Sequence, residues 1–144
     1  MTTTWETIDR HMAELMRQSG VTATDLIGLV SKESLHAWFG YDDTNTHGSV
    51  VYFVSVVGRP LVKIGFTGHL RQRLSHIQHY SIDPVVFEAA IPGDRITERA
   101  LHRRFAHHRV TGEWFTRTPE LDALIETATD RYPQPDLMVE STSR

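Results

Sequence analysis

Glu98 lies at a position where an ionised side chain is costly. In the segment that begins at Arg95, Leu101 and Phe105 follow the spacing of an apolar helix face, and Glu98 precedes them by three and seven residues. Residues at these spacings share one face of a helix, as does His102, four residues after Glu98. A carboxylate on a core-facing stripe must be paired with a cation or bind a metal ion. For such a residue taken alone, an ion pair with a nearby arginine is the commoner outcome.

A phenol and an ammonium group interrupt two neighbouring apolar segments. Tyr52 lies in the β-branched run 50–57, which is typical of a central strand, and Lys63 and Gly65 lie on one face of a second strand over 61–66. If these strands pair, Tyr52 and Lys63 converge on one phosphate. Lys63 is then expected to lower the pKa of Tyr52, and Gly65 to leave that face open. The alternative is a core tyrosine and a lysine whose stem packs on apolar surface.

Positive charge is concentrated in the middle of the chain. Residues 50–117 hold ten Lys or Arg and five Asp or Glu, a net charge of +5, whereas residues 1–49 (three against seven) and 118–144 (two against six) each carry −4. This pattern indicates either a local site for a polyanion or an uneven surface charge. Arg73, on a helix expected over 69–80, offers a planar fork for phosphate oxygens; the alternative is an ordinary surface charge.

Four short motifs, in this order and spacing, resemble the GIY-YIG nuclease superfamily, in particular its small phage and bacterial branch. The motifs are Val51-Tyr52-Phe53, Val62-Lys63-Ile64-Gly65, Thr97-Glu98-Arg99-Ala100-Leu101-His102-Arg103-Arg104-Phe105 and Gly112-Glu113-Trp114-Phe115. The resemblance implies a metal-dependent endonuclease that hydrolyses phosphodiester bonds in nucleic acid, with DNA as the expected partner. The alternative is a domain of the same fold that binds or regulates DNA without cutting it, since a fold does not determine function.

Carried over position by position, the resemblance implies roles for nine residues. The catalytic set is Tyr52, Lys63, Arg73 and Glu98. The substrate-binding set is Gly65, Arg71, Arg99, His102 and Arg109. Glu98 is implied to be the single carboxylate that binds Mg²⁺ or Mn²⁺, and Mg²⁺ prefers such oxygen ligands. Two positions depart from the superfamily, because Lys63 stands where the second motif usually has tyrosine and the only asparagine, Asn45, precedes the domain. Either Glu113 or no residue takes the place of the late asparagine.

The elements that must position these residues predict an α+β fold. Strands are expected over 50–57, 61–66 and 84–91, and helices over 69–80, 95–108 and 119–133. Asp94 and Thr118 are the expected N-caps of the last two helices. The β-β-α-β-α-α order predicts a small three-stranded, mixed or antiparallel sheet flanked by helices, with a short extended piece at 112–115.

Four regions are expected along the chain. They are an N-terminal helical extension over 1–40, a polar linker over 41–49, a GIY-YIG-like domain over 50–130 and a disordered tail over 131–144. Residues 5–18 predict an amphipathic helix, and a second helical stretch follows Thr22. Residues 19–39 also resemble a repressor-like helix-turn-helix with its recognition helix over 31–39; the alternative is a helical hairpin packed on the domain or on a partner.

The composition excludes several classes of protein. There is no cysteine, which excludes a disulfide framework and a thiolate zinc site. A zinc site on His102, His107 and His108 is disfavoured, because the last two are adjacent and point to different sides of a helix. No apolar run reaches the roughly 20 residues of a membrane helix, and no basic, then apolar leader begins the chain. We therefore expect an intracellular, cytoplasmic protein that does not engage a membrane.

Overall fold

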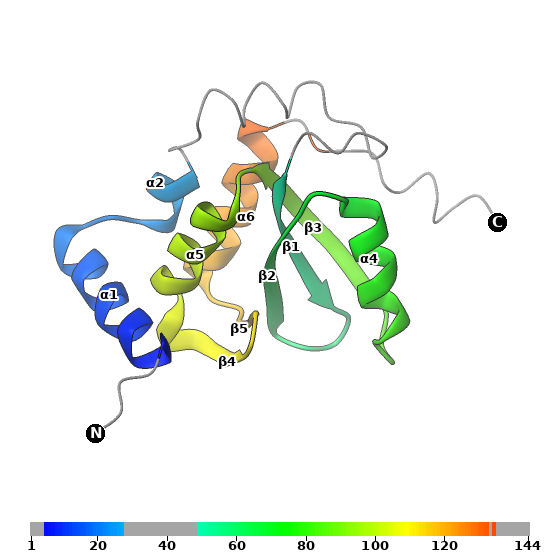
Figure 1. Ribbon diagram of the computed structural model, residues 1–144, viewed down its shortest axis with the longest axis horizontal. Coiled ribbons are helices and arrows are strands. Elements are labelled where there is room, and N and C mark those ends of the chain that lie inside the picture. The colour runs from blue at the N-terminus through cyan, green and yellow to red at the C-terminus, as the bar shows by residue number, and fades with distance from the viewer. Residues whose placement is uncertain (1–4, 28–48, 133, 135–144) are drawn as a thin grey trace.

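A central antiparallel sheet with helices on both faces organises the computed structural model, which describes residues 5–27, 49–132 and 134 (Figure 1). Along the chain the elements are α1 (Trp5–Ser19), α2 (Ala23–Ile27), β1 (Val50–Val56), β2 (Leu61–Thr67), α4 (Leu70–His79), β3 (Val85–Pro92), α5 (Arg95–Arg104), the 3₁₀ turn η1 (Ala106–His108), β4 (Arg109–Thr111), β5 (Trp114–Thr116) and α6 (Pro119–Arg131). The predicted recognition helix over 31–39, and nearly all of the predicted linker and tail, lie outside the described residues.

The strand β1 lies inside the sheet, whose strand order is β3-β1-β2-β5-β4. Tyr52 of β1 pairs with Gly65 of β2 on one side and with Ala90 of β3 on the other. Residues 50–54 are all buried, and they form a continuous apolar run with no alternation of apolar and polar side chains. Helices on both faces of the sheet shield a strand of this kind on both of its sides. The prediction of a central strand here is confirmed.

The α+β class and the sheet flanked by helices are confirmed, but the described sheet has five strands rather than three. Where the sequence predicts only a short extended piece, residues 109–116 form the hairpin β4–β5, and β5 pairs with β2 from Leu61 to Lys63. Gly112 takes a φ of +54° at the hairpin turn, which glycine adopts without steric cost. Strands of three residues carry too short an alternation to be recognised in a sequence.

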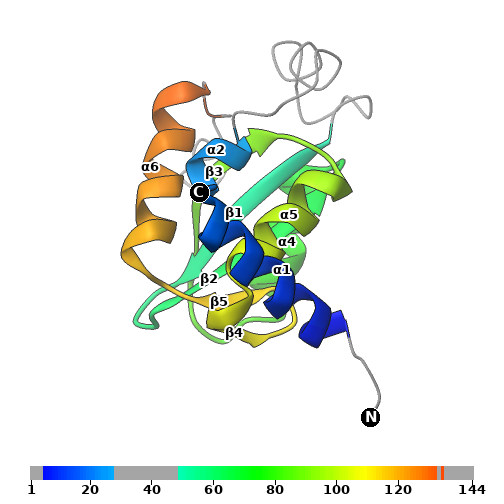
Figure 2. The same ribbon diagram turned by 90° about the vertical axis from the view of Figure 1, so that its left-hand side faces the viewer.

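Helices cover both faces of the sheet (Figures 1 and 2). α4 lies on one face, α5 and α6 lie on the other, and α1 packs on the outside of α5. α2 contacts both α5 and α6, so residues 5–27 pack on the helices that cover the sheet. Within the described parts of the chain, no helix has both the length and the apolar character needed to cross a membrane.

Local signals in the sequence determine where α5 and α6 begin. The Asp94 carboxylate accepts hydrogen bonds from Ile96 N at 2.9 Å and Thr97 N at 3.2 Å at the start of α5. Such an N-cap stabilises a helix by about 1 kcal/mol. Thr118 caps α6 in the same way, so both predicted N-caps are confirmed. α5 ends four residues before the predicted end, and the 3₁₀ turn η1 follows it.

Candidate active site

β2 extends further than the strand that pairs with its outer edge. β5 pairs with β2 as far as Lys63, and the next hydrogen bond runs from Ile64 N to Glu113 O at 3.0 Å. The carbonyl oxygen of Ile64 is hydrogen-bonded to Nε2 of His102, on α5, at 2.7 Å. Because a carbonyl only accepts, this ring nitrogen carries a proton. His102 therefore joins α5 to β2 at the point where the pairing with β5 stops.

The ring of Tyr52 lies across Gly65 on the neighbouring strand. The two residues are direct partners in the β1–β2 ladder, and Tyr52 is fully buried. A Cβ atom at position 65 would lie 2.3 Å from both Cζ and the hydroxyl oxygen of Tyr52, far inside van der Waals contact. The space at Gly65 is thus filled by the phenol instead of being open to a ligand, which corrects the substrate-binding role predicted for Gly65.

The hydroxyl group of Tyr52 faces an arginine of α4. Arg73 Nη1 donates a long hydrogen bond of 3.5 Å to this hydroxyl. Burial raises the pKa of Tyr52, and the rise outweighs the opposing effect of Arg73. The nearby carboxylates of Glu113 and Glu98 raise this pKa further. The expectation that Lys63 lowers the pKa of Tyr52 is wrong, because the ammonium group of Lys63 is engaged with Glu113.

Two carboxyl groups and this ammonium group meet beside the tyrosine. Glu98, in the first turn of α5, is 8 % exposed, which confirms the burial that the sequence predicts. Lys63 Nζ lies 3.0 Å from Glu113 Oε1 and 5.5 Å from the centroid of the Trp114 ring. Burial, then the negative charge of Glu113 and a hydrogen bond between the two carboxyl groups, together raise the pKa of Glu98 to about 7, against a smaller lowering by Arg95 and Lys63. At neutral pH Glu98 is therefore protonated part of the time.

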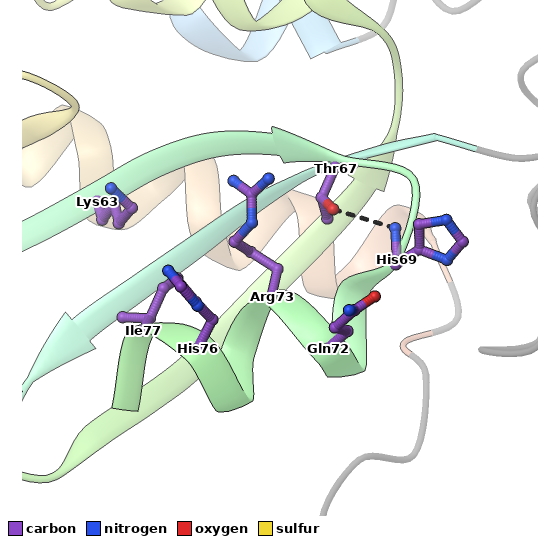
Figure 3. Close-up of a pocket in the computed structure, with 7 residues that line it drawn as sticks. All are labelled: Lys63, Thr67, His69, Gln72, Arg73, His76 and Ile77. Atoms are coloured by element: carbon purple, nitrogen blue, oxygen red, sulfur yellow. Dashed lines mark hydrogen bonds between the residues drawn. The ribbon is translucent and has the colours of Figure 1, made fainter. Parts of the chain in front are cut away.

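The ion pair of Lys63 with Glu113 links two pockets, since Lys63 lines one and Glu113 lines the other. The larger, of about 460 Å³, is lined by Lys63, Thr67, His69, Gln72, Arg73, His76 and Ile77 (Figure 3). The smaller, of about 330 Å³, is lined by Arg95, Glu98, Arg99, His102, Arg109, Gly112 and Glu113. In Figure 3, Arg73 extends from α4 toward the strands, between Lys63 and Thr67. The described residues that line the larger pocket include cationic but no acidic side chains, so this pocket suits a polyanion.

The structure gathers most of the residues singled out in the sequence. The predicted catalytic residues come from four different elements and meet in one place: Tyr52, Lys63, Arg73 and Glu98. Three of the predicted substrate-binding residues line the smaller pocket: Arg99, His102 and Arg109. His102 also donates a hydrogen bond from Nε2 to the Ile64 carbonyl, so one of its two ring nitrogens is already engaged within the fold. Arg71 is not among the described residues that line either pocket, so the geometry does not support its predicted role.

Sequence reasoning missed several residues of the larger pocket and left the role of Glu113 undecided. His69, Gln72 and His76 line that pocket together with Arg73. Their spacing of three and four residues places them on one face of a helix, and this signal could have found them. Glu113 had no comparable signal, because its position beside Glu98 depends on the path of the β4–β5 hairpin.

Comparison with known proteins identifies one family. A family model of the T5orf172 domain matches residues 49–129, a range that contains the sheet, both pockets and all the residues of the site. Neither the curated proteins nor the solved structures include a significant match.

Proposed function

The chain belongs to the T5orf172 domain family, and from this membership and the geometry of the site we propose that it is a metal-dependent endonuclease that hydrolyses phosphodiester bonds in DNA. The four motifs that resemble the GIY-YIG superfamily all lie within the matched range. We therefore propose that the matched domain is a nuclease domain of GIY-YIG type.

One observation carries the proposal. Four side chains that are far apart along the chain lie close together: Arg73 is hydrogen-bonded to Tyr52, Lys63 and Arg73 line the larger pocket, and Glu98 lines the smaller one. Their chemistry is complementary to a phosphodiester, since cations bind its charged oxygens, a phenol hydrogen-bonds to them, and a carboxylate binds a metal ion. A purely structural ion-pair cluster does not require a buried carboxyl group whose pKa is raised to about 7.

The donor set fits a small, hard divalent cation such as Mg²⁺ or Mn²⁺. Glu98 offers carboxylate oxygens, the ligand type that Mg²⁺ prefers, and Mg²⁺ is often bound by one or two carboxylates together with water and substrate phosphate. Within the described residues, no group of three or more His, Cys, Asp or Glu side chains is placed to hold a metal. When bound, the ion supplies Lewis-acid stabilisation of the charge that develops on the phosphate and on the leaving oxygen.

The cations of the larger pocket bind the scissile phosphate in this proposal. Arg73 offers a planar fork that matches phosphate oxygens, and Lys63 adds a second positive charge across the pocket. A phosphate held by Arg73 lies beside the hydroxyl group of Tyr52. Because burial raises the pKa of Tyr52, the phenol is protonated at neutral pH and donates a hydrogen bond. Since Tyr52 is fully buried, we assign it to positioning of Arg73, and through it of the phosphate; of the two roles that the resemblance implies for this tyrosine, general base or positioning phenol, we thus favour the second.

A carboxylate then has to accept the proton of the attacking water. We assign this role to Glu113, whose side chain is 36 % exposed, lines the smaller pocket and forms an ion pair with Lys63 of the larger one. The ammonium group of Lys63, 3.0 Å away, holds this carboxylate in position to accept the proton. Glu98 is reserved for the metal ion, as the resemblance implies.

Cleavage of supercoiled plasmid tests the proposal. We expect the wild-type chain to nick plasmid DNA with Mg²⁺ or Mn²⁺ and to lose this activity in EDTA. Glu98→Ala should abolish nicking. Arg73→Ala should slow it by about 10²- to 10³-fold, the range found when one group that stabilises transition-state charge is removed.

A matched arginine outside both pockets serves as the control. Arg59, in the β1–β2 turn, forms an exposed ion pair with Asp83 at 3.2 Å, so Arg59→Ala should leave nicking unchanged. Equal cutting by the wild type and Glu98→Ala refutes the proposal, as does the absence of cutting of any DNA form by folded protein. DNA binding without metal and without nicking identifies the chain as a binding domain instead.

A further inference from the structure

Three aromatic rings form a cluster at the C-terminal end of α4. The phenol ring of Tyr80 is 75 % exposed. Its centroid lies 4.9 Å from that of His76, with the planes tilted by 60°, and 5.0 Å from that of His79, which meets it edge-on at 90°. Neither histidine is stacked parallel on Tyr80. With 75 % of its surface exposed, Tyr80 keeps area of the phenol accessible for stacking.

The cluster continues the larger pocket. His76 lines that pocket on the same helix as Arg73 and also contacts Tyr80. Tyr80 lies seven residues beyond Arg73, which is about two turns or roughly 10 Å along the helix axis. At a rise of about 3.4 Å per nucleotide along a strand, this separation corresponds to about three nucleotides. A strand held at Arg73 and running along α4 therefore reaches the Tyr80 ring.

The two ends of α4 suit different parts of a nucleic acid. The first two turns carry Arg73 and the polar lining of the pocket, which favour phosphate. The last turn presents the negative end of the helix dipole, which disfavours phosphate and is indifferent to a neutral base. An exposed aromatic ring at that end fits the face of a base, and stacking of this kind is typical of proteins that bind single strands.

We propose that Tyr80 stacks on an unpaired base about three nucleotides from the phosphate held by Arg73, so that the substrate has a single-stranded stretch next to the cleaved bond. This inference rests on the proposed function, because it takes the larger pocket as the phosphate site. It names the form of the substrate: DNA with a flap, gap or frayed end in preference to continuous duplex. In a continuous duplex the faces of each base are covered by its neighbours, and Tyr80 has no base to stack on.

Equilibrium binding without cleavage tests this inference. The Glu98→Gln chain in EDTA is titrated with an oligothymidylate that carries one 2-aminopurine, and with the same strand in a duplex. We expect the 2-aminopurine fluorescence to be quenched when it stacks on Tyr80. A second substitution in that chain, Tyr80→Ala, should remove the quenching and weaken single-strand binding by about 5- to 100-fold, as the loss of one base–aromatic stack does. Duplex binding should change by less than about 2-fold.

Two control substitutions separate stacking from a general effect on the surface. Tyr80→Phe keeps the ring and should retain both quenching and affinity. Ile82→Ala removes an exposed apolar side chain two residues away and should change neither. If Tyr80→Ala weakens single-strand and duplex binding equally, or leaves the quenching intact, the inference is overturned.

The same measurements separate this inference from the proposed function. Plasmid nicking together with single-strand binding that does not depend on Tyr80 overturns the inference alone. Quenching that depends on Tyr80, in a chain whose wild-type form cuts no DNA, overturns the nuclease proposal and keeps Tyr80 as a base-stacking residue.

Discussion

Replacing Glu98 with glutamine should stabilise the fold above neutral pH while abolishing metal-dependent cleavage. Glutamine has nearly the same shape as glutamate and can keep a hydrogen bond to Glu113, but it carries no charge. The wild-type carboxylate is buried beside a second carboxylate, and both effects oppose its ionisation. The substitution therefore removes an unfavourable buried charge together with the proposed metal ligand.

The size of the effect follows from the pKa of Glu98. Folding raises this pKa from 4.5 to about 7. Each pKa unit corresponds to about 1.4 kcal/mol, so the ionised carboxylate opposes folding by up to about 3 kcal/mol. The charge is partly screened by solvent in the adjoining pocket, so we expect a gain of about 1–3 kcal/mol for the variant. In a chain of this size the melting temperature should rise by about 3–10 °C.

The gain should depend on pH in a defined direction. A carboxyl group whose pKa is raised by folding favours the folded state while it is protonated. That contribution is complete below pH 4.5 and is lost as the pH rises to about 7. Glutamine does not titrate, so the melting temperatures of the wild type and Glu98→Gln should coincide near pH 4.5 and diverge up to about pH 8.

Thermal unfolding followed by circular dichroism, in EDTA across this pH range, measures the difference. Addition of Mg²⁺ at pH 8 should raise the melting temperature of the wild type but not that of Glu98→Gln, since a ligand that binds only the folded state stabilises it. A variant that melts at or below the wild-type temperature at pH 8 refutes the conclusion that the buried charge of Glu98 opposes folding.

Glu88 provides a control of opposite sign. Burial alone would raise the pKa of Glu88, but hydrogen bonds from Arg117 at 2.9 Å and Ser55 at 2.6 Å outweigh it and lower this pKa. The ionised Glu88 therefore stabilises the fold, and this contribution is lost only as the pH falls below 4.5. Glu88→Gln should lower the melting temperature at pH 8, where Glu98→Gln raises it.

Two other substitutions test the surroundings of the site. Gly65→Ala should destabilise the fold by about 1–3 kcal/mol, as overpacking does, because the new Cβ would lie 2.3 Å from the phenol. Gly68→Ala, where an added Cβ meets no atom within 4 Å, is its matched control in denaturant unfolding, and equal losses in both variants would contradict the steric argument. Glu113→Gln should move the acid limb of the pH–rate profile of the residual activity below 7, because the charge of Glu113 is, after burial, the largest cause of the raised pKa of the buried glutamate. An acid limb that stays in place would show that the two carboxyl groups do not interact.

Much of the local structure could be predicted from the sequence, because the signals that determine it lie within a few residues of one another. The apolar run at 50–56 is a buried central strand. Asp94 and Thr118 begin the two helices that the sequence assigns to them. The spacing of Glu98 from Leu101 places the carboxylate on the buried face of α5. Each of these outcomes depends on backbone periodicity or on a side chain that bonds to its own neighbours, which a sequence records directly.

The tertiary structure alone decided how the site residues meet. Tyr52 faces Gly65 because β1 and β2 pair in one register, and a shift of one residue would turn the phenol to the opposite face. Glu113 lies beside Glu98 because the β4–β5 hairpin leaves β2 just past Lys63. The pKa values follow from these contacts, since burial and neighbouring charges belong to the folded arrangement and not to the order of residues. The residue types needed for chemistry are therefore written in the sequence, whereas their partners and protonation states are set by contacts between distant segments.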